Sequence, residues 1–387
     1  MEPYSRDREY QARILPGVSR TFALTIPVLP KKLADVVATA YLLCRIADTI
    51  EDDPSLEHEW KTEFHQRFLA VIEGEEDAEA FAIALTPRLS DQLLPDERNL
   101  VRNTARVVRV LRGFSTGEQQ AVMRCLVVMC SGMPKFQRNK SLMGLRDLEE
   151  LGAYCCVVAG VVGELLAELF CMHCPDLLKH RRKLRRLAVS FGLGLQMTNI
   201  LKDTWEDRRR GTCWLPRVLF SGRGSQLKRL EKFHSTDDFQ AGLKSLIGVT
   251  HRHLRNALEF TCMIPMREAG IRRFCLWTLG LAIMTLKKLY RNPYFTSGEE
   301  VKVSRRTVKA TILASNLNTA SNRRLRWLFS WASRGLPISQ AQTATVMCRA
   351  GRPHGVGVDR SLRSDLRSGG SAPDSRAVMA AAMRSPS

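Results

Sequence analysis

Two stretches decide the fold: Tyr41-Leu-Leu-Cys-Arg-Ile-Ala-Asp-Thr-Ile-Glu-Asp-Asp53 and Gln196-Met-Thr-Asn-Ile-Leu-Lys-Asp-Thr-Trp-Glu-Asp207. Each ends a long run in which apolar residues recur every three to four positions, the spacing of an amphipathic α-helix. Similar runs fill most of the chain up to residue 333, and the alternating pattern of a half-buried strand is nearly absent. We therefore predict an all-α, single-domain helical bundle.

The expected helices lie between proline-containing connections, one of which we place at Pro134. They cover 31–50, 60–72, 97–111, 118–133, 148–171, 183–206, 239–263, 267–290 and 303–333. From Gly335 onward the chain is rich in Gly, Ser, Arg, Ala and Pro, a composition that cannot bury enough apolar surface to offset the entropy of ordering. The sequence thus predicts a folded domain over 1–334 and a disordered basic tail over 335–387.

The charge balance indicates which partners to expect. The 387 residues include 59 Lys and Arg against 39 Asp and Glu, a formal net charge of +20 that attracts polyanions. Neither zinc-finger spacing nor an RNA-binding aromatic signature accompanies this charge, so we expect no nucleic-acid partner. Peripheral contact with an anionic membrane fits better.

The cysteines and the longest apolar runs bear on location. The 11 cysteines lack the spacing of a disulfide framework, and the N-terminus has no apolar signal sequence, which together favour the cytoplasm. The uncharged runs 151–163 and 274–286 fall short of the roughly 20 residues that span a bilayer. We therefore expect core helices there, no transmembrane anchor, and a cytoplasmic protein that associates with membranes peripherally.

The ends of the two quoted stretches are acidic in the same way. Asp48 and Asp52, like Asp203 and Asp207, are four residues apart and share one helix face. Like charges at this spacing repel, and the helix dipole near a C-terminus adds to the cost, so a compensating cation is expected. Mg²⁺ fits, because it prefers oxygen ligands and is usually held by one or two carboxylates together with phosphate oxygens. A solvated acidic helix end is the alternative, but two copies favour a metal–diphosphate site.

At this point the motifs resemble a known family, the squalene and phytoene synthases, and most closely the squalene synthase branch. The resemblance covers roughly residues 16–333, which would make 1–334 the catalytic domain. It rests on four motifs in order: Ser19–Phe22, 41–53, 154–163 and 196–207. It implies the isoprenoid synthase helical bundle with a central cavity. It also implies head-to-head condensation of two farnesyl diphosphates to presqualene diphosphate, followed by NADPH-dependent reduction to squalene.

The resemblance assigns roles to individual residues. Mg²⁺ would be held by six oxygen-bearing side chains: Asp48, Glu51, Asp52, Asn199, Asp203 and Asp207. Substrate would contact Arg20, Phe22, Tyr41, Arg45, Gln196 and Lys202. Arg45 would bind diphosphate through its planar guanidinium; an ion pair within its own helix is the alternative. Tyr154 would steer proton loss as presqualene diphosphate forms, although a core tyrosine bonded to a carbonyl would give the same pattern.

Small residues follow Tyr154 in the same helix. Ala159, Gly160 and Gly163 leave room for a farnesyl chain, but close packing of two helices would select them equally well.

Two departures from the family pattern concern the second diphosphate and the reductant. Lys202 stands where the family usually has Arg. Val301–Arg306 resembles the basic segment near the NADPH site of squalene synthases, and it makes Lys302, Arg305 and Asn316 the expected cofactor residues. Ser304 stands where an Arg is often found, and no Rossmann fingerprint is present. A solvated basic helix start is the alternative.

Two other functions stay open from the sequence. A dehydrosqualene or phytoene synthase would perform the same condensation without a reductant. A non-catalytic helical assembly factor would retain the fold but would not need both acidic faces. We expect a monomer with two farnesyl diphosphate molecules as its ligands.

Overall fold

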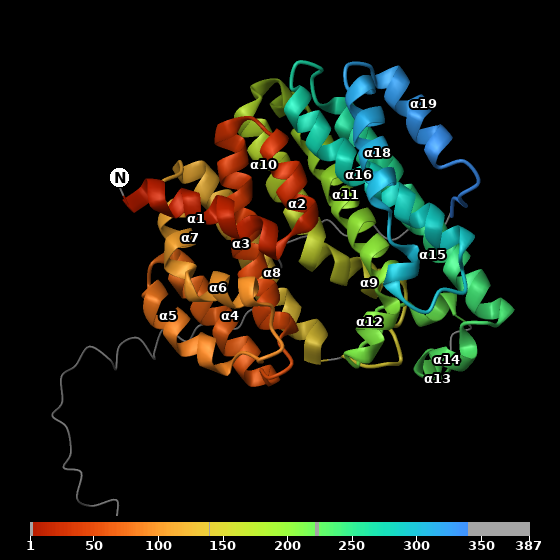
Figure 1. Ribbon diagram of the computed structural model, residues 1–387, viewed down its shortest axis with the longest axis horizontal. Coiled ribbons are helices and arrows are strands. Elements are labelled where there is room, and N and C mark those ends of the chain that lie inside the picture. The colour runs from red at the N-terminus through yellow and green to blue at the C-terminus, as the bar shows by residue number, and fades with distance from the viewer. Residues whose placement is uncertain (1–2, 139, 221–223, 340–387) are drawn as a thin grey trace, which may run out of the picture. The chain divides into compact units, whose positions relative to one another are not determined.

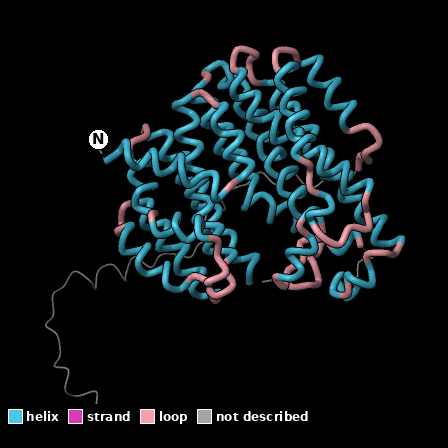
Figure 2. Tube along the Cα trace, viewed as in Figure 1, coloured by secondary structure: helices cyan, strands magenta, loops and turns pink. Residues whose placement is uncertain are grey.

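The computed structural model describes residues 3–138, 140–220 and 224–339, and every regular element within these ranges is a helix (Figures 1 and 2). The β-structure of the described part is limited to an isolated bridge between Leu145 and Pro216. The predicted all-α fold is confirmed. Apart from 335–339, the predicted tail lies outside the described residues, and its disorder stays a prediction.

The helices of the N-terminal half are α1 (Pro3–Val18), α2 (Arg20–Thr25), η1 (Ile26–Val28), α3 (Lys31–Asp52), α4 (His58–Glu73), α5 (Ala78–Leu85), η2 (Thr86–Arg88), α6 (Pro95–Arg102), α7 (Thr104–Arg112), α8 (Thr116–Arg138), α9 (Leu148–Cys155), the π-turn η3 (Cys156–Gly160), α10 (Val161–His173) and η4 (Pro175–His180). Those that follow are α11 (Arg181–Lys202), α12 (Thr204–Arg209), η5 (Arg217–Leu219), α13 (Gly224–Lys228), α14 (Leu230–Phe233), α15 (Asp237–Met263), α16 (Ala269–Arg291), α17 (Gly298–Val301), α18 (Arg305–Asn318) and α19 (Asn322–Ala332).

Several of the expected elements differ in detail, and the division of the helix predicted over 183–206 is described with the site below. The helix predicted over 97–111 is divided between α6 and α7, and the one predicted over 303–333 is divided between α18 and α19. The second division has a local cause, because the Ser321 side chain accepts a hydrogen bond from Arg324 N and so starts a new helix. Pro134 was placed in a connection, which is wrong: it lies inside α8. The short helix α5 and the N-terminal helices α1 and α2 were not predicted.

The centre of the bundle depends on glycines at the crossing of α10 and α11. A Cβ added at Gly163 would lie 2.2 Å from the Ala188 carbonyl oxygen, and one at Gly192 would lie 2.2 Å from that of Ala159. No side chain larger than hydrogen fits at either position. Close helix packing, rather than space for a substrate chain, therefore explains Gly163.

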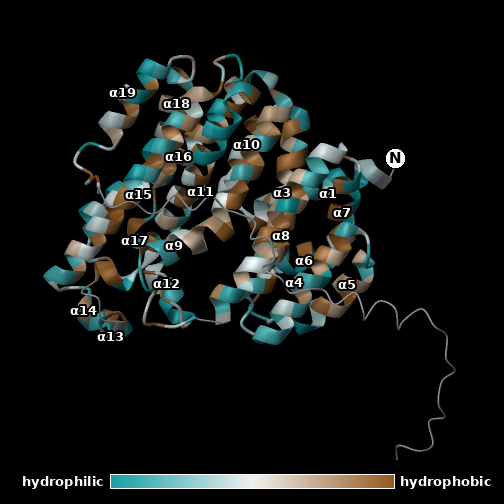
Figure 3. Cartoon of the chain, turned by 180° about the vertical axis from the view of Figure 1, so that it is seen from behind, coloured by the Kyte–Doolittle hydropathy of each residue, from teal (hydrophilic) through white to brown (hydrophobic). Residues whose placement is uncertain are grey.

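Two described helices are long and apolar enough to cross a membrane on length and composition alone: Leu148–His173 and Ala269–Arg291. The expectation that no segment reaches this length was too strict. Of their most apolar windows, 56% and 61% of residues are buried inside the protein, which is what core helices of a globular fold also show. Figure 3 shows hydrophobic stretches on α3, α8 and α10, which pack against one another.

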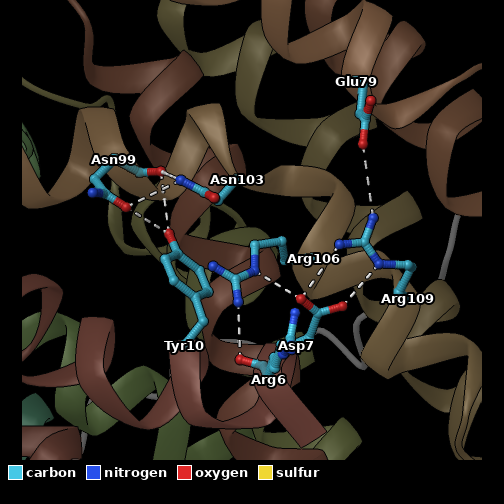
Figure 4. A network of polar contacts seen from close by, with 8 residues as sticks. All are labelled: Arg6, Asp7, Tyr10, Glu79, Asn99, Asn103, Arg106 and Arg109. Atoms are coloured by element: carbon cyan, nitrogen blue, oxygen red, sulfur yellow. Dashed lines mark hydrogen bonds and ion pairs between the residues drawn. The ribbon is translucent and has the colours of Figure 1, made fainter. Parts of the chain in front are cut away.

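The N-terminal helix α1 is fastened to α7 by a buried carboxylate (Figure 4). Asp7 is 3% exposed and accepts hydrogen bonds from Arg106 Nε at 2.7 Å and Arg109 Nε at 2.8 Å. Burial alone would raise the pKa of Asp7, but the bonds from Arg109 and Arg106 outweigh it and lower the pKa below 3.8. Here a buried charge is matched by opposite charge.

The C-terminal helices are joined by a buried arginine instead of a buried carboxylate. Arg272 on α16 is fully buried, and its guanidinium donates to neutral oxygens. Nε donates to the Thr319 carbonyl at 2.8 Å, Nη1 to the Ile264 carbonyl at 2.6 Å, and Nη2 to Asn322 Oδ1 at 2.7 Å. This one side chain thus joins the end of α15, the turn between α18 and α19, and the start of α19.

Candidate active site

The first acidic segment is the C-terminal end of α3, an unbroken helix of 22 residues. Its apolar residues are buried, and Asp53 ends the helix by leaving the helical conformation. The buried Asp53 carboxylate accepts hydrogen bonds from Ser55 N at 2.8 Å and Ser90 N at 2.9 Å. Asp53 therefore has a structural task, which leaves Asp48, Glu51 and Asp52 as the carboxylates available to a ligand.

Burial, together with repulsion from neighbouring carboxylates, makes Asp48 and Glu51 hard to ionise. Burial raises the pKa of Asp48 to about 7, against the opposing effect of Arg45 and with a further rise from Asp52. Burial likewise raises the pKa of Glu51 to about 7, and Glu51 Oε2 is buried without a hydrogen-bond partner. A bound cation would relieve both costs, so the donor set fits a hard metal ion.

Arg45 and Asp48 both lie on α3, but Arg45 forms its ion pair with a residue of another helix. Its guanidinium forms an ion pair with Glu97 at the start of α6, so the intrahelical pair considered from the sequence is not what the structure shows. Arg45 Nε is buried without a partner. The charge of Asp48 acts on the guanidinium and, together with Glu97, raises the pKa of Arg45 although burial opposes this. Glu97 holds Arg45 in place while one donor stays available.

The Ser19–Phe22 motif lies beside α3, one turn before Arg45. Ser19 caps α2 by accepting a hydrogen bond from Phe22 N at 3.1 Å, and Arg20 is the first residue of that helix. The Tyr41 hydroxyl donates to the Val18 carbonyl at 3.1 Å, and the rings of Phe22 and Tyr41 lie 4.8 Å apart. Of the predicted substrate residues, Phe22 is thus brought into contact with Tyr41 of the first acidic helix, and Arg20 begins the short helix beside it.

The second acidic segment is broken where the first is continuous. α11 ends at Lys202, α12 begins at Thr204, and Asp203 lies at the junction. The hydrogen bonds of a helix nevertheless continue, from Asp203 N to the Asn199 carbonyl at 2.7 Å and from Asp207 N to the Asp203 carbonyl at 2.8 Å. The predicted stripe of Asn199, Asp203 and Asp207 therefore survives the break. Lys202 Nζ pairs with Asp203 at 3.1 Å.

The charges of the two segments act on each other. Burial raises the pKa of Asp207 to about 7, and both Asp203 and Asp52 of the other segment raise it further. Burial also raises the pKa of Tyr154, with Asp52 and Asp207 adding to the rise. Because such effects weaken with distance, the two acidic ends and Tyr154 lie near one another.

Tyr154 lies in an aromatic group at the end of α9. Its ring stacks on Trp214 at a centroid distance of 3.9 Å and meets Phe136 edge-on at 5.4 Å. The π-turn η3 follows directly, and such turns are frequent at functional sites. Neither Trp214 nor Phe136 was singled out from the sequence, since nothing local links them to residue 154.

Gly298, just before the segment expected to bind the reductant, lies against the second acidic segment. Gly298 N donates to Glu206 Oε1 at 3.0 Å, and a Cβ at Gly298 would come within 3.2 Å of the Lys202 carbonyl oxygen. Lys302 follows at the end of α17, but its ammonium is bound to Glu299 at 2.5 and 2.8 Å.

The other two residues expected to bind the reductant lie on α18. Arg305 is exposed at its start, whereas Asn316 Oδ1 accepts from Trp277 Nε1 at 3.1 Å. Structural bonds thus engage Lys302 and Asn316.

The described residues contain no group of three or more His, Cys, Asp and Glu side chains close enough to hold a metal by themselves. The acidic residues are instead divided between two helix ends. This arrangement matches the habit of Mg²⁺, which takes one or two carboxylates and completes its shell with water and substrate oxygens. The predicted ligand set stays a prediction.

Comparison with known proteins identifies similar chains. The family described as squalene/phytoene synthase matches residues 15–307. The squalene synthase of Saccharomyces cerevisiae is 28% identical over 306 residues, which cover 77% of this chain and 64% of the yeast protein. The squalene synthase of Nicotiana benthamiana is 30% identical over 286 residues, covering 72% of this chain and 64% of the plant protein. The match thus spans somewhat under two thirds of these relatives' length.

Solved structures share the fold. A complex of TcSQS with the ligand BPH1237 aligns with a TM-score of 0.66 and 22% identity, covering 85% of this chain and 98% of that one. A dehydrosqualene synthase in complex with a ligand aligns with a TM-score of 0.56 and 20% identity, covering 82% and 98%. The same helical arrangement therefore accommodates both kinds of enzyme.

Proposed function

Because this chain belongs to the squalene/phytoene synthase family, we propose that it condenses two farnesyl diphosphates head-to-head to presqualene diphosphate and reduces this product with NADPH to squalene. The proposal is carried by one observation: the acidic ends of α3 and α12 act electrostatically on each other and on Tyr154. A site that gathers so many half-buried carboxylates is suited to a polyanion bound through cations.

The first task of the site is to let diphosphate leave as an anion. Mg²⁺, when bound, would neutralise the charge that builds up on the leaving diphosphate. Asp48, Asp52, Asp203 and Asp207 would hold it, with Glu51 and Asn199 as further oxygen donors. Arg45, fixed by Glu97, would donate to one diphosphate, and Lys202 and Gln196 would lie nearest the other.

The second task is to guide the allylic cation that remains. Tyr154, in contact with Trp214 and Phe136, would direct the proton lost as the cyclopropane ring of presqualene diphosphate closes. The aromatic walls would exclude water, which would otherwise quench the cation to an alcohol. Phe22, whose ring lies near those of Tyr41 and Phe274, would extend this shield.

A second candidate is a dehydrosqualene-type synthase that uses no reductant. The contacts of Lys302 with Glu299 and of Asn316 with Trp277 favour it, since both of these expected cofactor-binding side chains already have partners. Arg305 at the start of α18 favours the NADPH-dependent function, because an exposed guanidinium suits the phosphate of that cofactor.

Incubation with farnesyl diphosphate and Mg²⁺, with and without NADPH, separates these functions. Squalene formed only with NADPH, and presqualene diphosphate accumulating without it, is the expected result. Dehydrosqualene formed regardless of NADPH would replace the proposal by the second candidate. Absence of any C30 product under both conditions would instead favour a non-catalytic assembly factor. Monomeric state, cytoplasmic location and peripheral contact with an anionic membrane belong to the same proposal.

A further inference from the structure

The hairpin formed by α18 and α19 presents an apolar surface to solvent. Trp327 and Trp331 on α19 are 66% and 61% exposed, whereas no other tryptophan of the chain exceeds 38%. Leu313 and Leu317 on α18 are 61% and 69% exposed. In each pair the residues are four apart, so they lie on one face of their helix. Leaving four large apolar side chains in water is costly unless a partner covers them.

The hairpin is also strongly basic. Residues 302–334 contain eight basic residues and no acidic one; the basic residues are Lys302, Arg305, Arg306, Lys309, Arg323, Arg324, Arg326 and Arg334. Exposed Arg306 and Lys309 continue the stripe of Leu313 and Leu317 toward the start of α18. Such a surface attracts an anionic partner and repels a second copy of itself.

The hairpin is held from its inner side, which leaves the outer side available. Leu325 and Phe329 are buried, and the Lys287 ammonium donates to the Ala332 carbonyl at 2.9 Å. Arg272 fixes the turn through Thr319 and Asn322. In both ribbon views α19 lies at the edge of the helical bundle (Figures 1 and 3). The surface is therefore a rigid one, and not a loop that could fold back over its own apolar residues.

We propose that the outer face of the α18–α19 hairpin is the surface by which the protein docks on an anionic phospholipid bilayer. Tryptophan prefers the level of the lipid headgroups, leucine enters the edge of the acyl region, and arginine and lysine contact phosphate. A nucleic acid would satisfy the cations and the tryptophans but would offer nothing to the exposed leucines. The inference rests on the membrane contact included in the proposed function and gives that contact a location.

Vesicle co-sedimentation of the full chain, without substrate, tests the proposal. The wild-type protein should bind phosphatidylcholine vesicles containing about 30% phosphatidylserine and should be released by salt, because the attraction to anionic lipid is screened. Each basic residue near such a surface contributes roughly a fivefold gain in affinity. Arg323→Gln/Arg324→Gln should thus lower binding at least tenfold, and Trp327→Ala/Trp331→Ala by about as much.

Matched controls separate the hairpin from the general charge and from folding. Arg182→Gln/Arg186→Gln removes two exposed arginines at the start of α11, and Ile83→Ala/Leu94→Ala removes two exposed apolar residues elsewhere. Both controls should bind within about twofold of wild type. Brominated lipid should quench the fluorescence of the wild-type protein and much less that of Trp327→Phe/Trp331→Phe. Phenylalanine keeps an apolar ring there, so this variant reports contact even if the alanine variant folds poorly.

Three results would overturn the proposal. In the first, the wild-type protein fails to bind anionic vesicles. In the second, the hairpin variants and the control variants lose vesicle affinity equally, and in the third the protein binds a single-stranded RNA oligonucleotide but not vesicles. Condensation activity measured in detergent is independent of all three. A chain that binds vesicles but makes no product would refute the proposed catalysis alone.

Discussion

The two acidic segments carry the same sequence pattern on different backbones. In the first, α3 runs unbroken through Asp52, and the cation beside it is Arg45, which is held from α6 by Glu97. In the second, the helix is interrupted at Asp203, and the cation is Lys202, which pairs with its own neighbour. Both segments nevertheless contain an aspartate, Asp48 or Asp207, whose pKa is raised to about 7. The shared property is thus one half-buried aspartate with a raised pKa in each segment, while the helix and the cation are free to differ.

The largest effect should come from removing a carboxylate in either segment. Asp48→Asn and Asp203→Asn should each reduce kcat by roughly a thousandfold, the order expected when one group that stabilises developing charge is lost. Steady-state rates with farnesyl diphosphate and Mg²⁺ measure this, with circular dichroism to confirm folding. The exposed acid Asp91 offers a control, and Asp91→Asn should keep full activity. A fully active variant in one segment would make the two segments unequal in function as well as in form.

Substitution of the two cations, Arg45 and Lys202, should show a larger difference between the segments. Arg45→Lys removes the guanidinium that Glu97 orients, and kcat/KM should fall by about tenfold to a hundredfold, as for a lost charge-assisted hydrogen bond. Lys202→Arg should stay within about threefold of wild type, because Lys202 is paired locally and the charge is kept. Equal losses in both variants would contradict a special role for the interhelical pair.

Glu97 should act as a positioning residue for Arg45. Glu97→Gln keeps the size of the side chain but weakens its hold on the guanidinium, which should raise KM about three- to tenfold and change kcat less. Inorganic pyrophosphate, used as an inhibitor, should bind more weakly by the same factor. A purely structural role would instead lower the thermal midpoint and leave the inhibition constant unchanged.

The smallest effect on catalysis is expected at Asp53, which adjoins the first segment but serves the fold. Asp53→Ala leaves the amides of Ser55 and Ser90 without their acceptor and should lower the free energy of unfolding by about 1–3 kcal/mol. Urea denaturation measures this loss. Turnover per folded molecule should stay within about twofold of wild type, and a large fall in kcat would place Asp53 among the ligands instead.

Much of this arrangement could be predicted from the sequence, because it depends on the spacing of apolar and acidic residues along single helices. The helix containing Asp48 and the one leading up to Asp203 follow from apolar spacing, and the stripe of Asn199, Asp203 and Asp207 follows from helix geometry. The break at Asp203 could not be foreseen, since the residues around it continue the helical pattern. The serine that divides α18 from α19 was visible at position 321 but lies in a run with strong helical spacing.

Contacts between distant segments could not be predicted. Glu97 is 52 residues from Arg45, and no local signal connects them. The same holds for Trp214 beside Tyr154 and for Gly298 beside Glu206, where only the fold brings the partners together. The role of Gly163 was left open between substrate space and packing, and the distance to the facing carbonyl decided it.

Arg272 has a consequence for the order in which the protein assembles. Its charge is buried among oxygens from the end of α15, the turn after α18 and the first residue of α19. If only some of these segments were folded, the guanidinium would be buried without all of its hydrogen-bond partners, which is costly. The α15–α16 turn and the C-terminal hairpin should therefore open and close as one cooperative unit. Hydrogen exchange should show their amides with a common opening free energy, and a protease cut between α18 and α19 should loosen the α15–α16 turn as well.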